Sequence, residues 1–149
     1  MKKNFLLIAI GIWICFIFYN SLQNADSSSQ SSGWALNLVL NIFSKLNISV
    51  DPITTHLLIR KFAHIFEYFV LAILFTLYFS LLNMSDMYRL IYSISLPGIV
   101  AIIDEIIQSY VPGRAGLMSD VLIDMIGVVL GVGLVILIIR IKTKRQQKS

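Results

Sequence analysis

Four long apolar runs divide the chain, and each is close to the length that an α-helix needs to cross a bilayer. They cover residues 4–20, 58–82, 87–109 and 117–139. A helix of about 20 apolar residues spans the roughly 30 Å of bilayer hydrocarbon, and lipid offers no hydrogen-bond partner to irregular backbone. The pattern therefore predicts an all-α integral membrane protein with four transmembrane helices, forming a single membrane domain over residues 1–149.

The connection between the first two spans, residues 21–57, changes character along its length. It opens with a serine-rich stretch that has no apolar face to pack, which predicts a surface loop. Residues 34–48 then place polar side chains at helical spacing among apolar ones, which predicts an amphipathic helix along the membrane interface. Packing of this helix over the bundle is an equally good interpretation. Asp51 and Pro52 predict the start of the second spanning helix, as N-cap and first helical residue.

Proline and glycine positions predict two further features of the spans. Pro97 and Gly98 lie in the middle of the third span, where the missing N–H of proline predicts a kink or an opened backbone. Gly127, Gly131 and the nearby Gly133 place small residues on the fourth span, which predicts close contact with another helix.

Composition agrees with a membrane location. Of the 149 residues, 57% are hydrophobic and 13% charged, and the mean hydropathy is +0.81, whereas soluble domains carry roughly 25% charged residues. The single cysteine, Cys15, excludes a disulfide framework within one chain. The first run begins with Lys2 and Lys3, as a secretory signal does, but no small-x-small cleavage site follows. We therefore expect a retained anchor helix.

The net charge of +4 indicates topology rather than a nucleic-acid partner. Basic residues gather beside the hydrophobic runs, and cytoplasmic flanks are enriched in lysine and arginine. If both termini are cytoplasmic, so are eight of the twelve basic residues, namely Lys2, Lys3, Arg89, Arg140, Lys142, Lys144, Arg145 and Lys148. The distribution predicts a multi-pass protein with both termini in the cytoplasm and no nucleic-acid partner.

Ionisable and polar residues inside the apolar runs are the most informative pattern. They occupy one face of each of three spans: Arg60, Lys61, His64 and Glu67 on the second, Asp104, Glu105 and Gln108 on the third, and Asp120 and Asp124 on the fourth. A charged residue at a helix centre costs about 2.5–3.5 kcal/mol on insertion scales, so such residues mark a functional site by default. By helical rise they all fall in the outer half of the membrane, and the turn at 111–116 brings Arg114 over the same opening. The pattern predicts one outward-facing, acid-rich intramembrane site.

The residue types at this site suggest roles. The candidate catalytic residues are His64, Glu67, Asp104 and Asp120, with His64 and Glu67 as an acid–base pair. The candidate substrate-binding residues are Arg60, Lys61, Glu105, Gln108, Arg114 and Asp124, among which arginine suits phosphate oxygens. The excess of carboxylates requires compensation, either by a divalent metal ion held by Asp104, Asp120 and Asp124 or by a shared proton network.

A purely structural role for the same charges is the alternative. Two ion pairs could simply orient helices, namely Arg60 with Glu67 and Arg114 with Asp120. Glu105 points about 100° away from Asp104 on a helix, so one of these two acids is expected either to pair with Lys61 or to cap a neighbouring helix.

Three sequence blocks resemble the VanZ-like family of small bacterial membrane proteins, which includes a protein associated with teicoplanin resistance. The blocks are FYNSLQ in the first span, IRKFAHIFEYFVLAILF in the second, and DEIIQSYVPGRAGLMSDVLIDMIGVVLG across the third and fourth. One departure lies at the end of the first span, where relatives often carry Ser-Ser and Gln and this chain keeps only Ser21 and Gln23. The resemblance implies a bacterial cell membrane, a cell-envelope role and an effect on teicoplanin-type lipoglycopeptides. It implies no biochemical activity for particular residues.

These observations lead to three hypotheses of function. In the first, the site binds or modifies a membrane lipid phosphate, such as an isoprenoid phosphate or a lipid-linked cell-wall intermediate. In the second, the protein is a proton- or ion-coupled transporter, which requires polar residues to continue across the membrane. In the third, it is a non-catalytic structural partner that docks a larger envelope enzyme through the helix at 34–48.

Overall fold

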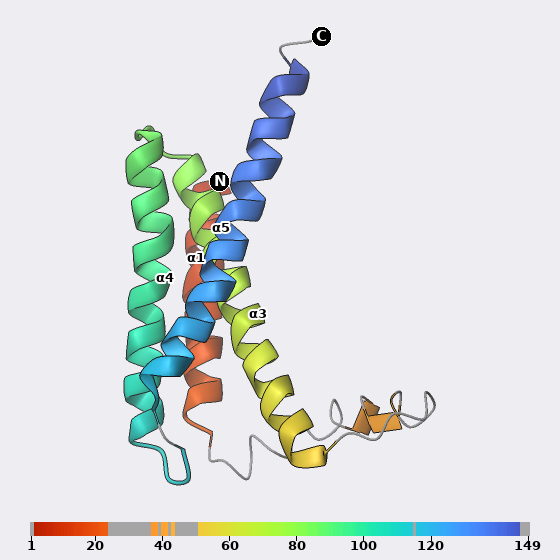
Figure 1. Ribbon diagram of the computed structural model, residues 1–149. Coiled ribbons are helices and arrows are strands. Elements are labelled where there is room, and N and C mark those ends of the chain that lie inside the picture. Colours follow the sequence, from red (N-terminus) through yellow and green to blue (C-terminus); the bar gives the residue numbers. More distant parts are fainter. Residues whose placement is uncertain are drawn as a thin grey trace.

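A computed structural model describes residues 2–23, 37, 38, 40, 41, 43, 51–114 and 116–146 of the chain. Four long helices account for most of them (Figure 1): α1 (Lys2–Ser21), α3 (Pro52–Ser80), α4 (Asp86–Ser109) and α5 (Met118–Gln146). All four are long and apolar enough to cross a membrane. Every regular element among the described residues is helical, so the predicted all-α fold with four spans is confirmed.

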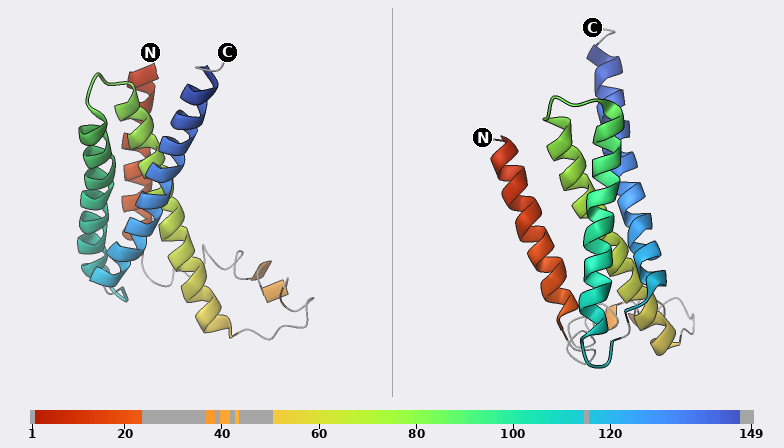
Figure 2. Two further views of the ribbon diagram at one scale, coloured as in Figure 1. Left: turned by 45° about the horizontal axis from the view of Figure 1, so that its top comes forward. Right: turned by 90° about the vertical axis from the view of Figure 1, so that its left-hand side faces the viewer.

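The helices form one bundle in which α3 and α5 share the most extensive contact. We call the end of the bundle where α3 and α5 begin the site end, and the opposite end the termini end. Both chain termini lie at the termini end (Figure 1). In the right-hand view of Figure 2, α1 diverges from α4 toward its N-terminus, so the two helices approach each other most closely at the site end.

Close contact between α3 and α5 depends on two glycines of α5. A Cβ atom added at Gly127 would overlap the Ile65 carbonyl oxygen, and one added at Gly131 would overlap the Phe69 carbonyl oxygen. Small residues let helix backbones approach in this way, so the predicted contact is confirmed at both positions. It is wrong for Gly133, where a Cβ atom would meet nothing within 4 Å. Two residues beyond Gly131, the side chain has turned by about 200° and faces away from α3.

Helix α3 begins with the N-cap that its sequence predicts. The Asp51 carboxylate accepts a hydrogen bond from Thr54 N at 2.9 Å, and Pro52 is the first helical residue, as predicted. Hydrogen bonds from the Thr54 hydroxyl and amide lower the pKa of Asp51.

Pro97 does not open the backbone of α4. The helix is continuous from Asp86 to Ser109, and Pro97 is one of its buried residues.

The predicted interfacial helix at 34–48 lies mostly outside the described residues. The structure describes positions 37, 38, 40, 41 and 43 of it, and all five are helical.

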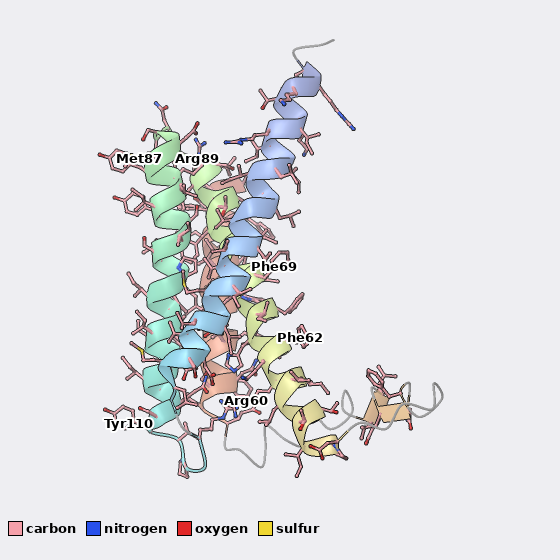
Figure 3. All side chains as sticks on the ribbon, viewed as in Figure 1. Arg60, Phe62, Phe69, Met87, Arg89 and Tyr110 are labelled. Atoms are coloured by element: carbon pink, nitrogen blue, oxygen red, sulfur yellow. The ribbon has the colours of Figure 1, made fainter. Side chains whose placement is uncertain are left out.

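The distribution of side chains is that of a protein in lipid. Large apolar side chains point outward, with Phe62 66% exposed and Leu122 70% exposed, and Figure 3 shows Phe62 directed away from the bundle. In contrast, Asp104 and Asp124 are completely buried. An exposed apolar surface around buried carboxylates is unfavourable in water and suits a bilayer.

Candidate functional site

The buried polar residues gather at the site end of the bundle. Figure 3 shows Arg60 there, at the same end as Tyr110, whereas Met87 and Arg89 lie at the termini end. The clustering follows from chain direction, because α3 and α5 begin at this end while α1 and α4 finish there. Polar residues early in two helices and late in the other two are thereby brought together.

A chain of hydrogen bonds crosses the site from α1 to α3. The Ser21 hydroxyl donates to one oxygen of the Asp104 carboxylate, and Gln108 Nε2 donates to the other at 3.0 Å. Arg60 in turn donates from a guanidinium nitrogen to Gln108 Oε1 at 3.1 Å. Asp104 and Gln108 are both fully buried, and a buried carboxylate requires such donors. Gln108 therefore connects the most buried acid of α4 to the arginine of α3.

Helix α1 contributes more to the site than its sequence indicates. Asn20 Nδ2 donates to Glu67 Oε1 at 2.7 Å, and Trp13 Nε1 donates to the Glu67 backbone carbonyl at 2.9 Å. Trp13, Asn20 and Ser21 were not predicted as members of the site. The block FYNSLQ, which carries part of the family resemblance, contains Asn20 and Ser21 but not Trp13.

His64 of α3 pairs with an acid of α5. Its Nδ1 atom lies 3.4 Å from Asp124 Oδ1, and Asp124 is completely buried. Glu67, predicted as the acid–base partner of His64, instead accepts its side-chain hydrogen bond from Asn20. The Asp124 carboxylate of α5 thus contacts the His64 imidazole of α3 through Nδ1. A carboxylate in this position can orient an imidazole that acts as an acid–base residue.

Glu105 caps the start of α5. Its Oε2 atom accepts a hydrogen bond from Leu117 N at 2.9 Å, just before α5 begins at Met118. Of the two neighbouring acids, Glu105 is thus the one that caps a neighbouring helix, where the first amides need an acceptor and favour negative charge.

Arg114 reaches the site from the turn between α4 and α5. It donates to the Ser21 backbone carbonyl at 3.2 Å. Burial lowers the pKa of the Arg114 guanidinium and the nearby Arg60 lowers it further, whereas Asp104 and Glu105 act in the opposite direction. The guanidinium remains charged at neutral pH.

The structure contains neither of the ion pairs considered from sequence. Among the described residues, the side-chain ion pairs are His64 with Asp124 and, at the termini end, Arg89 with Asp86. Neither Arg60 with Glu67 nor Arg114 with Asp120 is among them. Both arginines use uncharged partners instead.

A cavity of about 320 Å³ opens between the first turns of α3 and the start of α5. Its lining comprises Leu57, Arg60, Lys61, His64, Leu117, Ser119, Asp120 and Ile123. Two predicted site residues, Lys61 and Asp120, therefore line the cavity instead of joining the buried acids. The site has two parts. One is a cavity lined by two cations, apolar side chains and the Asp120 carboxylate, and the other is a buried cluster of acids behind it, with His64 in both.

Comparison with known proteins agrees with the sequence resemblance. The family model VanZ/LLP1 matches residues 5–140, which include parts of all four helices and every side chain of the site described above. No curated protein and no solved structure matches the chain. Because the match covers nearly the whole sequence, this chain is a multi-pass membrane protein that belongs to the VanZ-like (VanZ/LLP1) family.

Proposed function

We propose that this protein binds the phosphate group of a membrane lipid or of a lipid-linked cell-wall intermediate in the cavity between α3 and α5. The observation that carries the proposal is the lining of the cavity. Two cations, Arg60 and Lys61, stand against one carboxylate, Asp120, so the formal charge of the lining is positive. An apolar wall is supplied by Leu57, Leu117 and Ile123. A phosphate joined to a hydrocarbon chain has complementary chemistry on both counts.

The two cations differ in how they are held. Arg60 is half-buried and uses one guanidinium nitrogen to bond Gln108, so its remaining N–H groups can bind phosphate oxygens from a fixed position. Lys61 is exposed at the side of the cavity and acts as a mobile point charge. We therefore assign phosphate orientation to Arg60 and general attraction of anions to Lys61.

The orientation of the chain in the membrane determines which lipid leaflet can supply the ligand. Both termini lie at the termini end, and the basic residues near them favour a cytoplasmic position for that end. The site end then faces outward, and its lipid comes from the outer leaflet of a bacterial cell membrane. Reduced susceptibility to teicoplanin-type lipoglycopeptides is the envelope phenotype that this proposal leads us to expect.

A transporter is less well supported, because few of the described polar side chains are buried beyond the site end of the bundle. Toward the termini end, the buried polar side chains among the described residues are Thr76 and Ser93. The Thr76 hydroxyl donates to the Ala72 carbonyl within its own helix. The docking hypothesis depends on the segment at 34–48, most of which lies outside the described residues.

Replacing Arg60 by glutamine should abolish selective binding of lipid phosphates. Loss of a charge-assisted hydrogen bond is worth about 1.5–3 kcal/mol, which corresponds to roughly 10–100-fold weaker binding. The measurement is native mass spectrometry or fluorescence titration of the purified full chain with an isoprenoid phosphate and with phosphatidic acid. Lys61→Gln should weaken binding less, because Lys61 is exposed.

Two controls make this test specific. Lys142→Gln removes an exposed cation from the other end of α5 and should leave binding unchanged. An isoprenol or diacylglycerol of the same chain length lacks the phosphate and should bind at least about tenfold more weakly. Equal binding of the phosphorylated and unphosphorylated lipids, or wild-type binding by Arg60→Gln, would exclude the proposal.

A further inference from the structure

Four potential metal ligands converge behind the cavity. His64, Asp104, Glu105 and Asp124 each offer one ligand atom, and these atoms all lie within 4.8 Å of one another. They come from three helices, α3, α4 and α5. We infer that this cluster, which we call the HDED cluster, is a binding site for a divalent transition-metal ion. The inference goes beyond the proposed function, because it needs no lipid.

Buried oxygen atoms without hydrogen bonds are the independent observation behind this inference. Asp124 is completely buried, and neither of its carboxylate oxygens has a hydrogen-bond partner within the described structure. Glu105 is 5% exposed, and its Oε1 atom also lacks such a partner there. A buried acceptor needs a donor or a cation. These oxygens belong to the same four residues whose ligand atoms converge.

Charge balance points in the same direction. The HDED cluster contains three carboxylates, and the nearby arginines do not form ion pairs with them. Arg60 bonds the Gln108 side chain, and Arg114 bonds the Ser21 backbone carbonyl. A divalent ion among three ionised carboxylates changes their net charge from −3 to −1, a charge that Arg60 and Arg114 can balance at longer range. Among the described residues, His64 is the one basic side chain in ion-pair contact with the three acids, so a bound metal ion accounts for the negative charge that remains.

The spacing and types of ligand favour a transition metal over magnesium or calcium. His64 Nδ1 lies 3.4 Å from Asp124 Oδ1, which is the separation of two ligands each about 2.1 Å from a tetrahedrally coordinated ion. Imidazole together with carboxylate suits zinc, manganese or iron, whereas magnesium and calcium prefer oxygen alone.

Hydrogen bonds to the outer sides of the ligands complete the site. Ser21 and Gln108 hold the Asp104 carboxylate, and Leu117 N holds Glu105 Oε2 while Oε1 stays free to bind. A carboxylate has about four lone-pair positions, so Asp104 can accept these bonds and still bind a metal. Such outer contacts orient ligands in known metal sites and raise their affinity.

The test measures metal binding by the full chain in detergent, with the purification tag removed and bound metal stripped by chelator. Mn²⁺ binding is followed by electron paramagnetic resonance, and Zn²⁺ binding by its competition with Mn²⁺. We expect one ion per chain, displaced by Zn²⁺ but not by equimolar Mg²⁺, and a rise in thermal unfolding temperature on metal addition. Asp124→Asn and Glu105→Gln should each weaken binding by at least about tenfold.

Stability without metal separates lost ligands from lost folding. Asp124→Asn and Glu105→Gln remove a buried negative charge but keep an amide oxygen that can face His64 or accept from Leu117 N. The metal-free variants should therefore unfold at the same or a higher temperature than the metal-free wild type. Two further carboxylates serve as controls. Asp86→Asn acts at the termini end, and Asp51→Asn acts on the exposed N-cap of α3, where asparagine caps as well as aspartate. Both variants should retain binding within about threefold of the wild type.

Three outcomes would overturn the inference. The first is no Mn²⁺ or Zn²⁺ binding at millimolar concentration, in which case the acids share protons instead. The second is an equal loss of binding in Asp51→Asn and Asp124→Asn, which would indicate unspecific attraction to negative charge. The third is a metal-induced rise in unfolding temperature that persists unchanged in Asp124→Asn.

Discussion

Replacing Gly127 by alanine is expected to destabilise the bundle by about 2 kcal/mol, because the added methyl group forces α3 and α5 apart. At this position a Cβ atom would meet backbone, namely the Ile65 carbonyl oxygen, and a carbonyl cannot rotate away as a flexible side chain can. Reversible unfolding in mixed micelles, followed by circular dichroism, measures the free energy of unfolding. The expected loss also disturbs the site, since His64 precedes Ile65 on α3 and Asp124 precedes Gly127 by three residues on α5.

Gly133→Ala is the matched control for this prediction. Gly133 lies on the same helix, but a Cβ atom there would meet nothing within 4 Å. Alanine is the better helix former by roughly 0.5–1 kcal/mol, and this gain is the same at both positions. Gly133→Ala should therefore be neutral or slightly stabilising, and the difference between the two variants isolates packing. Similar free energies for both would contradict the close-contact explanation.

The number and positions of the helices could be predicted because hydropathy reports the membrane solvent directly. The ends of the helices were harder to predict from hydropathy. The fourth span is apolar to about residue 139, yet α5 continues to Gln146 through a basic segment. Outside the hydrocarbon a charged helix is stable, so hydropathy gives no signal there. The start of α3 was predictable for a different reason, because Asp51 and Pro52 form a local cap that needs no tertiary information.

The polar residues that α3, α4 and α5 bring to the site end could be predicted from sequence, but their partners and the contribution of α1 could not. Helical spacing places His64 and Glu67 on one face of α3, and this suggested that they act together. Their actual partners, Asp124 and Asn20, lie on other helices and depend on how those helices rotate and cross. Asn20 and Ser21 stand at the end of an apolar run, where two polar residues create no periodicity. The division into a cavity with Asp120 and a buried cluster with Asp124 likewise required coordinates.

Replacing Gln108 by leucine is expected to lower the free energy of unfolding by about 3 kcal/mol and to weaken lipid-phosphate binding as well. Gln108 is fully buried and links two charged groups, donating to Asp104 at 3.0 Å and accepting from Arg60 at 3.1 Å. Gln108 Nε2 also donates to the Ser21 hydroxyl at 3.5 Å. Leucine is similar in size, so the loss reports these hydrogen bonds and the charged partners left without them. Gln108 does not line the cavity, so weaker lipid binding would identify it as a positioning residue for Arg60.

A double-mutant cycle separates this role from a general loss of packing. Arg60→Met, Gln108→Leu and the double variant should give a coupling energy of about 1–2 kcal/mol, because the two side chains interact directly. Ser109→Ala is the neighbouring control. Its exposed hydroxyl donates to the Ile106 carbonyl within α4, so the variant should change stability by less than about 0.5 kcal/mol. Additive effects of Arg60→Met and Gln108→Leu, together with wild-type lipid binding by Gln108→Leu, would show that Arg60 reaches phosphate without help from α4.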